Sequence, residues 1–230
     1  MRYVIDPPAQ SGVPVAGGGE FPVHRIYCVG RNYAEHAQEM GHTGREPPFF
    51  FLKPADTVLP VAEGQTGTMA YPTLTDNLHH EIELVVAIGR GGSGIRAADA
   101  AGHIFGYAVG LDMTRRDLQS DMKKQGRPWS IGKAFEQSAP IAPIVPLARC
   151  GELSAGAITL DVNGTRKQKG DLADLIWNVA ETIEQLSQAW LLQPGDLIFT
   201  GTPAGVGAVL RGDLMEGRIE GLGSLRVQVA

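Results

Sequence analysis

The sequence predicts a β-rich α+β domain, and three observations support this fold class. Short apolar segments bounded by Gly, Pro and Asn recur along the 230 residues, which is typical of a protein with many short strands. The regular alternation of strands and helices that builds a doubly wound sheet does not occur. Helical periodicity extends over one long segment, in the C-terminal half. We therefore expect several strands, a few short helices and one long helix.

Residues 1–22 are rich in Pro and Gly and predict an N-terminal arm or short hairpin. The remaining residues, 23–230, have the length of a single domain. Turn residues bound the apolar segments there, and an Ala-rich segment predicts a brief helix. We expect strands at 25–30, 49–53, 81–88, 104–111, 197–200 and 224–229, and the brief helix at 97–103.

Two features organise the C-terminal half. Asn163-Gly164 suits the type I′ turn of a β-hairpin between residues 158 and 169. The long helix is expected at 172–192, because apolar side chains recur there at helical spacing on one face. Asp171 is suited to cap its start, and Pro194-Gly195 is suited to end it.

The composition excludes several classes of protein. The net charge is −5 and no basic segment occurs, so neither nucleic acid nor an anionic membrane is expected as a partner. No apolar segment is long enough to span a membrane, and the N-terminus lacks the pattern of a signal peptide. The two cysteines, Cys28 and Cys150, form neither a disulfide framework nor a zinc motif. We therefore expect a cytoplasmic protein.

Three carboxylates suggest a metal site. Glu81 and Glu83 lie on an expected strand, and Asp112 closes a second apolar segment. Because alternate residues of a strand share a face, the two glutamates would point the same way. Carboxylates that close repel each other, and a cation would relieve the repulsion. Oxygen ligands favour Mg²⁺, or Mn²⁺. The alternative is a solvent-facing strand with two ordinary surface acids.

Three further segments carry groups suited to catalysis. If residues 34–40 are helical, His36 and Glu39 meet on one face, where the carboxylate would tune the imidazole as a base. Lys133 stands among apolar and small residues, where it would stabilise an oxyanion or an enolate. Residues 200–207 form a Gly-rich loop that would bring backbone N–H groups to an anionic ligand. The alternative for His36 and Glu39 is an ordinary surface contact. For Lys133 it is a side chain whose apolar stem packs while its ammonium reaches water, and for residues 200–207 it is a simple tight turn.

Two other motifs compete with this interpretation. Residues 89–94 match the G-x-G-x-x-G pattern of NAD-binding oxidoreductases and follow an expected strand. The short helix after them and the lack of β-α alternation argue against that fold. His79-His80-Glu81 contains part of a zinc-hydrolase motif, but no second His follows four positions after His80.

Several motifs occur in a fixed order between about residue 22 and the C-terminus. They are Tyr27-Cys28-Val29-Gly30-Arg31-Asn32-Tyr33, Phe51-Leu52-Lys53-Pro54, His79-His80-Glu81-Ile82-Glu83-Leu84, Gly110-Leu111-Asp112-Met113-Thr114-Arg115-Arg116-Asp117, Gly132-Lys133-Ala134-Phe135 and Thr200-Gly201-Thr202-Pro203-Ala204-Gly205-Val206-Gly207. Together they resemble the fumarylacetoacetate hydrolase family.

The resemblance implies a mixed β-sandwich roll, a homodimer, and a catalytic domain at 23–230. It also implies a metal held by Glu81, Glu83 and Asp112 and a positive charge beside it from Lys133. His36 and Glu39 would be a catalytic pair over bound substrate. The residues that the resemblance places around the substrate are Lys53, Arg116, Gln119 and Thr202. Arg31 is a further candidate for substrate binding, because a positive charge is expected there.

Within the family, residues 45–51 resemble those of fumarylpyruvate hydrolases, a group of acylpyruvate hydrolases. The implied reaction is metal-dependent hydrolysis of a C–C bond in a small 2,4-dioxo acid. The expected substrate is fumarylpyruvate, which would give fumarate and pyruvate in gentisate-type aromatic catabolism. Oxaloacetate or 2-oxo-acid decarboxylation, or isomerisation, on the same fold stays open. Arg31, Arg45 and Arg127 are the candidates to bind the distal carboxylate.

Overall fold

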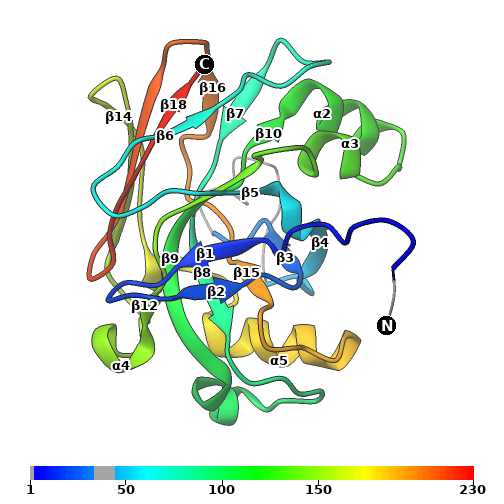
Figure 1. Ribbon diagram of the computed structural model, residues 1–230, viewed down its shortest axis with the longest axis vertical. Helices are drawn as coiled ribbons and strands as arrows, with labels where there is room; N and C mark the ends of the chain where they lie inside the picture. Colours follow the sequence, from blue (N-terminus) through cyan, green and yellow to red (C-terminus); the bar gives the residue numbers. More distant parts are fainter. Residues whose placement is uncertain (1–2, 34–44) are drawn as a thin grey trace.

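The computed structural model describes residues 3–33 and 45–230. The fold is β-rich α+β, as the sequence predicted, with one large mixed sheet at its centre (Figure 1). The strand order of this sheet is β4-β3-β15-β8-β9-β11-β5, and β12 pairs with β9. Its strands are β3 (Ile26–Gly30), β4 (Phe49–Lys53), β5 (Val58–Pro60), β8 (Ile82–Ile88), β9 (Ile104–Leu111), β11 (Ala139–Ile141), β12 (Val145–Pro146) and β15 (Leu197–Phe199).

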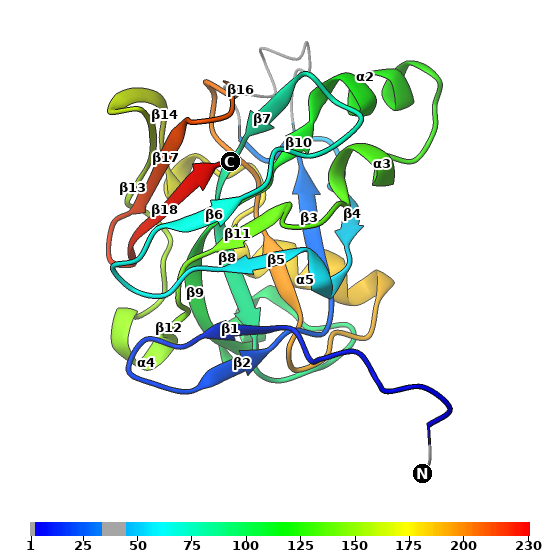
Figure 2. The same ribbon diagram turned by 45° about the horizontal axis from the view of Figure 1, so that its top comes forward.

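A second sheet of five strands packs against β8 and β9, in the order β14-β13-β17-β18-β6. Its strands are β6 (Gly67–Met69), β13 (Ala157–Val162), β14 (Thr165–Asp171), β17 (Leu214–Ile219) and β18 (Gly223–Val229). A short sheet of β10 (Thr114–Arg115), β7 (Leu78–His80) and β16 (Gly207–Val209) lies near the C-terminus (Figure 2). The hairpin of β1 (Gly12–Pro14) and β2 (Glu20–Pro22) forms a separate pair.

Helices and 3-10 turns connect the strands. They are α2 (Arg116–Lys124), α3 (Ser130–Lys133), α4 (Leu147–Cys150), α5 (Val179–Ala189) and the 3-10 turns η1 (Ala55–Thr57), η2 (Ala97–His103) and η3 (Leu172–Asp174). In Figure 1, α5 lies below the large sheet, while α2 and α3 lie at the opposite end of the molecule. No helix in the described part of the chain is long and apolar enough to cross a membrane.

The central strand β8 is buried on both faces, which explains its continuous apolar sequence. Leu84 and Val86 belong to the core between the two large sheets, while Val85 and Ala87 belong to a second core on the opposite face. The N-terminal hairpin covers that second face, where Val13 is fully buried. Because side chains alternate along a strand, Glu83 points to the same face of β8 as Val85 and Ala87.

The expectation of a single helix over 172–192 is wrong. Asp171 begins only the 3-10 turn η3, and the chain is extended again at Leu175. Asn178 then accepts a hydrogen bond from the backbone N–H of Glu181 and starts α5, which ends at Ala189. The apolar periodicity was continuous, but two N-caps divide the segment into two elements. The predicted hairpin, in contrast, is confirmed, because Asn163 and Gly164 have the positive φ values, 50° and 74°, that a type I′ turn requires.

Candidate metal centre and its pocket

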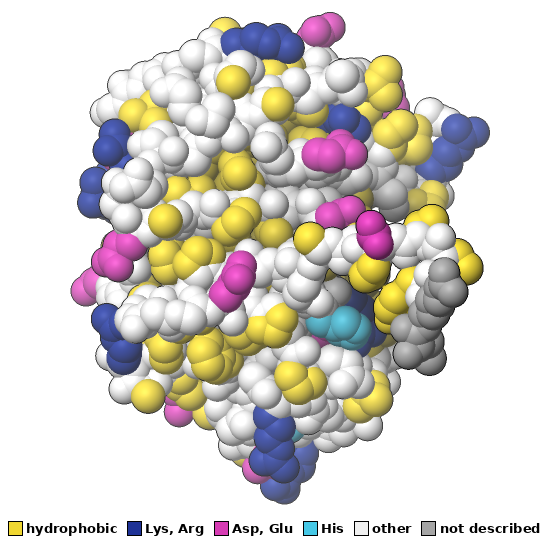
Figure 3. Space-filling model, in the orientation of Figure 1, with side chains coloured by type: hydrophobic (Ala, Val, Ile, Leu, Met, Phe, Trp, Pro, Cys, Tyr) yellow, Lys and Arg dark blue, Asp and Glu magenta, His cyan; other side chains and the backbone are white. Residues whose placement is uncertain are grey.

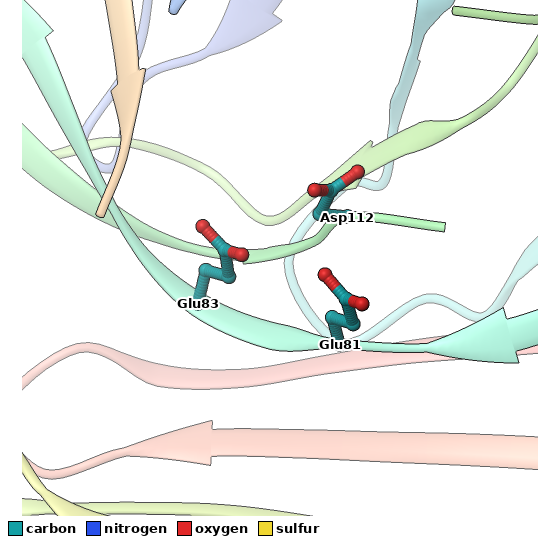
Figure 4. A group of neighbouring side chains, drawn as sticks. All are labelled: Glu81, Glu83 and Asp112. Atoms are coloured by element: carbon teal, nitrogen blue, oxygen red, sulfur yellow. The ribbon is translucent and has the colours of Figure 1, made fainter. Parts of the chain in front are cut away.

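Three carboxylates meet at one end of the central strand pair. Glu81 immediately precedes β8, Glu83 lies within it, and Asp112 immediately follows β9. Residues 81 and 112 stand opposite each other, since the N–H of Asp112 donates to the carbonyl oxygen of Glu81 at 2.9 Å. The three side chains point toward one another (Figure 4), and each offers an oxygen within 4.8 Å of the others. The strand register therefore gathers a three-oxygen ligand set.

These carboxylates lie in a buried environment. Glu83 is only 2% exposed and Asp112 only 1%. Burial, together with the negative charges of Asp112 and Glu81, raises the pKa of Glu83 well above its usual value. Like charges on facing strands destabilise a sheet unless a positive charge compensates them. The backbone N–H of Gly201 supplies part of that compensation, because it donates to Glu83 Oε2 at 2.8 Å.

Cationic side chains surround the other two acids. The Lys133 ammonium lies 2.8 Å from Glu81 Oε2 and 2.6 Å from Asp112 Oδ2. Burial alone would lower the pKa of Lys133, but these carboxylates outweigh burial and raise it, so the side chain stays charged. Burial would likewise raise the pKa of Glu81, but Lys133 and Arg116 outweigh it and hold that pKa well below its usual value. An internal ion-pair network is therefore part of the site.

The acids fit a hard divalent cation as well. Oxygen atoms alone make up the ligand set, which suits Mg²⁺ or Mn²⁺. Lys53 Nζ lies 2.9 Å from Asp112 Oδ1, yet this buried oxygen accepts no hydrogen bond from any described residue. The ion pair with Lys53 compensates the charge of this oxygen, but the oxygen accepts no hydrogen bond within the described part of the chain. The chain thus offers the negative charge that a metal ion requires, and a carboxylate oxygen that no hydrogen bond from a described residue occupies.

A pocket opens over the carboxylates. Arg31, Arg116, Gln119, Lys133 and Thr202 line it together with the three acids. Its remaining described lining is Val29, Gly30, Phe49, Phe51, Lys123, Trp129 and Gly201. An apolar wall with a few convergent charged groups is typical of a site for a small molecule.

The structure gives Lys53 a different place from the other expected substrate residues. Lys53 is buried beneath Asp112 and is not part of the pocket lining given by the described residues. It hydrogen-bonds to Ser138 Oγ at 3.0 Å and to the carbonyl oxygen of Lys133. Lys53 therefore supports a carboxylate and the end of α3 rather than facing the pocket.

Residues 200–207, which we name the site loop, connect β15 to β16 beside the acids. Gly201 has a φ of +101°, and a Cβ there would lie 2.8 Å from Cβ of Asn32. Asn32 holds the start of the loop, because its Nδ2 donates to the carbonyl oxygens of Thr200 and Trp177 at 2.8 and 2.9 Å. The expected approach of a backbone N–H to an anion is present, but the anion is the side chain of Glu83.

His36 and Glu39 lie outside the described residues, so their expected role stays a prediction. The described residues on either side contact the segment before α5. Tyr33 pairs with Leu175, and the indole N–H of Trp177 donates to the carbonyl oxygen of Glu46 at 3.1 Å.

Residues 89–94, which we name the packing loop, do not form the phosphate cradle of a nucleotide-binding protein. The backbone N–H groups of Gly89, Gly92 and Gly94 donate to the carbonyl oxygens of His103, Leu192 and Ser187, at 2.8, 3.0 and 2.8 Å. These donors therefore serve internal packing against η2, α5 and the chain that follows α5. The NAD-binding alternative loses its structural basis.

The two histidines before Glu81 do not join the carboxylates in a ligand cluster of the described residues. His79 Nε2 lies 2.8 Å from Asn77 Oδ1, and burial together with Arg116 lowers the pKa of His79 to about 4. His80 Nδ1 lies 2.9 Å from Oε1 of Gln168, and burial lowers its pKa. A zinc-hydrolase arrangement is therefore not supported.

Sequence reasoning missed Asn32, Lys123, Ser138 and Gln168. Asn32 was inside a recognised motif, but its role depends on contacts with residues far along the chain. Gln168 gave no signal, because it stands among charged residues of an expected surface hairpin.

On the face seen in Figure 3, Lys and Arg side chains lie mostly near the periphery, so this face presents no concentrated basic surface.

Comparison with known proteins places this site in a family. The family model "Fumarylacetoacetate (FAA) hydrolase C-terminal" matches residues 25–230. The crystal structure of fumarylpyruvate hydrolase from Pseudomonas aeruginosa, in complex with Mn²⁺ and pyruvate, is 56% identical. It superposes with a TM-score of 0.98 and covers 100% of this chain and 99% of that one.

Two curated relatives carry different names. The fumarylpyruvate hydrolase of Ralstonia sp is 48% identical over 184 residues, which is 80% of this chain and 93% of the relative. The mitochondrial oxaloacetate tautomerase of Rattus norvegicus is 43% identical over 204 residues, which is 89% of this chain and 90% of the relative. Since the family model spans nearly the whole chain, the protein belongs to the fumarylacetoacetate hydrolase family.

Proposed function

We propose that the protein is a metal-dependent hydrolase that cleaves a C–C bond of an acylpyruvate, with fumarylpyruvate as the substrate and fumarate and pyruvate as products. The observation that carries the proposal is the buried acid cluster of Glu81, Glu83 and Asp112 at the floor of a cationic pocket. The similarity to a fumarylpyruvate hydrolase that binds Mn²⁺ and pyruvate supports it. The reaction belongs to gentisate-type aromatic catabolism.

In this proposal the three acids hold Mg²⁺ or Mn²⁺. The bound ion would supply Lewis-acid stabilisation of negative charge that develops on the substrate. Arg116 orients Glu81 and donates to Gln119 Oε1 at 2.5 Å, which fixes both side chains at the pocket wall. Lys133, which is only 2% exposed, places a second positive charge where the pyruvate enolate would leave.

The proposed proton transfers involve the two residues outside the described part of the chain. Glu39 would orient His36, which removes a proton from the water that attacks the C4 carbonyl. The C3–C4 bond then breaks, its electron pair forms the pyruvate enolate, and protonation at C3 gives pyruvate. The His36→Ala variant should lose roughly 10²- to 10⁴-fold in turnover and retain metal binding. If the variant turned over at nearly the wild-type rate, His36 would have no role in the mechanism.

We also propose Arg31 and Lys123 as the groups that meet the distal carboxylate of fumarylpyruvate. Both line the pocket, and the Arg31 guanidinium lies 5.2 Å from the ring centre of Phe49. Arg45 instead stacks on Trp177 at 4.3 Å and contacts Glu181, away from this pocket. If the proposal holds, Ala variants of Arg31 or Lys123 lose more activity on fumarylpyruvate than on acetylpyruvate, which lacks the second carboxylate.

A second candidate function is conversion of oxaloacetate, by tautomerisation or decarboxylation. The 43% identity to the rat oxaloacetate tautomerase favours keeping it. Its substrate shares the 2-oxo acid end, so the acid cluster and Lys133 would serve both reactions. The reactions differ in their products, because only the hydrolase releases fumarate and only a decarboxylase releases CO₂.

The deciding experiment follows the loss of fumarylpyruvate absorbance with Mg²⁺ or Mn²⁺, with and without a chelator, and detects pyruvate and fumarate. Chelator-sensitive formation of both products in equal amounts is the expected result. Intact fumarylpyruvate, with turnover of oxaloacetate under the same conditions, would replace the hydrolase by the second candidate function.

We further propose a cytoplasmic homodimer, with residues 1–22 as an N-terminal arm and 23–230 as the catalytic domain. Two free cysteines, Cys28 and Cys150, are compatible with a reducing compartment. Leu52 is 42% exposed on the edge strand β4, and Ile131 is 45% exposed on the neighbouring α3, which favours association through this side. Light scattering of the purified protein and of the Leu52→Lys variant tests the dimer and this surface.

A further inference from the structure

A buried amide, that of Gln168 in β14, lies behind the pocket and joins three segments of the chain. Gln168 is 0% exposed. Its Oε1 lies 3.1 Å from the backbone N of Ile82 and 2.9 Å from Nδ1 of His80. Its Nε2 lies 2.8 Å from Oγ1 of Thr202 and 2.8 Å from the carbonyl oxygen of Pro203. The side chain thus links the strand of the metal ligands to the site loop.

Backbone groups fix the orientation of this amide. The N–H of Ile82 can only donate, so the atom of Gln168 that faces it must be the oxygen. The carbonyl of Pro203 can only accept, so the atom that faces it must be the nitrogen. Since Oε1 only accepts, His80 must carry a proton on Nδ1. Since Nε2 only donates, the Thr202 hydroxyl must accept.

This arrangement leaves the hydroxyl proton of Thr202 for another acceptor. A hydroxyl carries one proton, and no described residue accepts a hydrogen bond from Thr202. Thr202 is buried and lines the pocket that contains the acids and Lys133. The neighbouring Thr200 differs, because its hydroxyl donates to the carbonyl oxygen of Leu84 at 3.0 Å. The proton of Thr202 is therefore available to an acceptor in the pocket.

Close packing keeps β14 and the site loop in this register. A Cβ on Gly205 would lie 2.1 Å from the carbonyl oxygen of Lys167, and a Cβ on Gly170 would lie 2.7 Å from Cβ of Pro203. The two segments therefore touch on both sides of Gln168. The loop cannot move away from the strand without breaking the hydrogen bonds of the amide.

We propose that Gln168 is a positioning residue that holds the Thr202 hydroxyl as a hydrogen-bond donor to a carboxylate or 2-oxo oxygen of the bound 2-oxo acid. The proposal rests on the proposed function, because it requires such an acid in the pocket. Without the Nε2 donor, the Thr202 hydroxyl would be free to donate backward, toward position 168. It would then present a lone pair to an anionic oxygen, which weakens binding.

The test is a double-mutant cycle between positions 168 and 202, read by calorimetric titration of pyruvate into the Mn²⁺-loaded protein. Thr202→Val should weaken pyruvate binding roughly 10- to 100-fold, the usual effect of losing a hydrogen bond to a charged group. Gln168→Glu keeps the acceptor for Ile82 but removes the donor to Thr202. In the Gln168→Glu background, Thr202→Val should weaken binding less than about two-fold, because the donor is already lost. Thr200→Val is the matched control and should retain pyruvate affinity.

Several measurements separate this role from a structural one. Titration of Mn²⁺ alone reports metal affinity, which should survive in Thr202→Val. If Gln168→Glu does not fold, Gln168→Met enters the same cycle: it removes the Nε2 donor that orients the Thr202 hydroxyl without offering a strong acceptor, so Thr202→Val should still weaken pyruvate binding less than in the wild-type background. An undiminished effect of Thr202→Val in both backgrounds would overturn the role of Gln168 and leave the proposed function standing. Absence of pyruvate binding to the Mn²⁺-loaded wild-type protein would overturn both.

Discussion

The site loop and the packing loop are similar in sequence and opposite in use. Each is rich in glycine and directly follows a strand, β15 in one case and β8 in the other. These strands are antiparallel neighbours in the large sheet, with Phe199 opposite Val85. The two loops therefore leave the same strand pair at opposite ends. Only the site loop leaves at the end that carries the acids.

The destination of the backbone N–H groups separates the two loops. In the packing loop, Gly92 and Gly94 donate to backbone carbonyl oxygens of residues in and after α5. In the site loop, Gly201 donates to the carboxylate of Glu83. A glycine-rich sequence supplies close approach and donors in both loops. Strand direction then decides whether those donors serve packing or a charged site.

The largest expected effect comes from removing one acid at the site end of the strand pair. Asp112→Ala should abolish tight Mn²⁺ binding and lower turnover by roughly 10³-fold, since metal-based charge stabilisation is worth several kcal/mol. It would also leave the buried ammonium groups of Lys53 and Lys133 short of a partner. Mn²⁺ titration and steady-state kinetics measure both losses.

Asp99 provides the control at the other end of the strand pair. It lies in η2, after the packing loop, where it forms an exposed ion pair with Arg96. Exposed pairs of this kind contribute little, so Asp99→Ala should leave metal affinity and turnover near the wild-type values. Equal Mn²⁺ affinity in Asp112→Ala and the wild-type protein would remove Asp112 from the ligand set.

A smaller effect is expected when the site loop itself is changed. In Gly201→Ala the new Cβ meets Asn32, and the φ of +101° disfavours alanine. We expect the loop to shift and Glu83 to lose its backbone donor. Loss of such supporting contacts to a ligand lowers metal affinity or activity by about 10- to 100-fold. Mn²⁺ titration measures the change, and circular dichroism checks that the variant is folded.

The sequence predicted the cluster of three acids, but not the residues that support it. Glu81 and Glu83 share a face because strand side chains alternate, which is a local property. The burial of Gln168 depends on contacts with the site loop, so its local sequence of exposed charged residues is misleading. The predicted helix over 172–192 was too long, because apolar periodicity does not show that Asn178 starts a new element.

A substitution in the packing loop should lower the stability of the protein rather than its activity. A Cβ at Gly91 would lie 2.4 Å from the backbone carbonyl oxygen of Leu192, which cannot move easily. Overpacking of this kind costs about 1–3 kcal/mol, so Gly91→Ala should lower the Tm by roughly 2–4 °C per kcal/mol. Mn²⁺ affinity should be retained at a temperature where the variant is folded. A loss of metal affinity with unchanged Tm would contradict the division between the loops.

The last expected effect is on the pH dependence of stability, and it concerns His79 at the site end of β8. Burial and Arg116 lower the pKa of His79 to about 4, below its value of 6.5 in an unfolded chain. Between these values the unfolded state binds more protons at this position, so His79 makes stability increase as pH rises from about 4 to 6.5. His79→Gln should flatten that slope in urea unfolding series, because glutamine does not titrate. His103→Gln is the matched variant for comparison, because it removes a histidine beside the packing loop, at the other end of β8. If His79→Gln retains the wild-type slope over this pH range, another group at the site end must bind the protons.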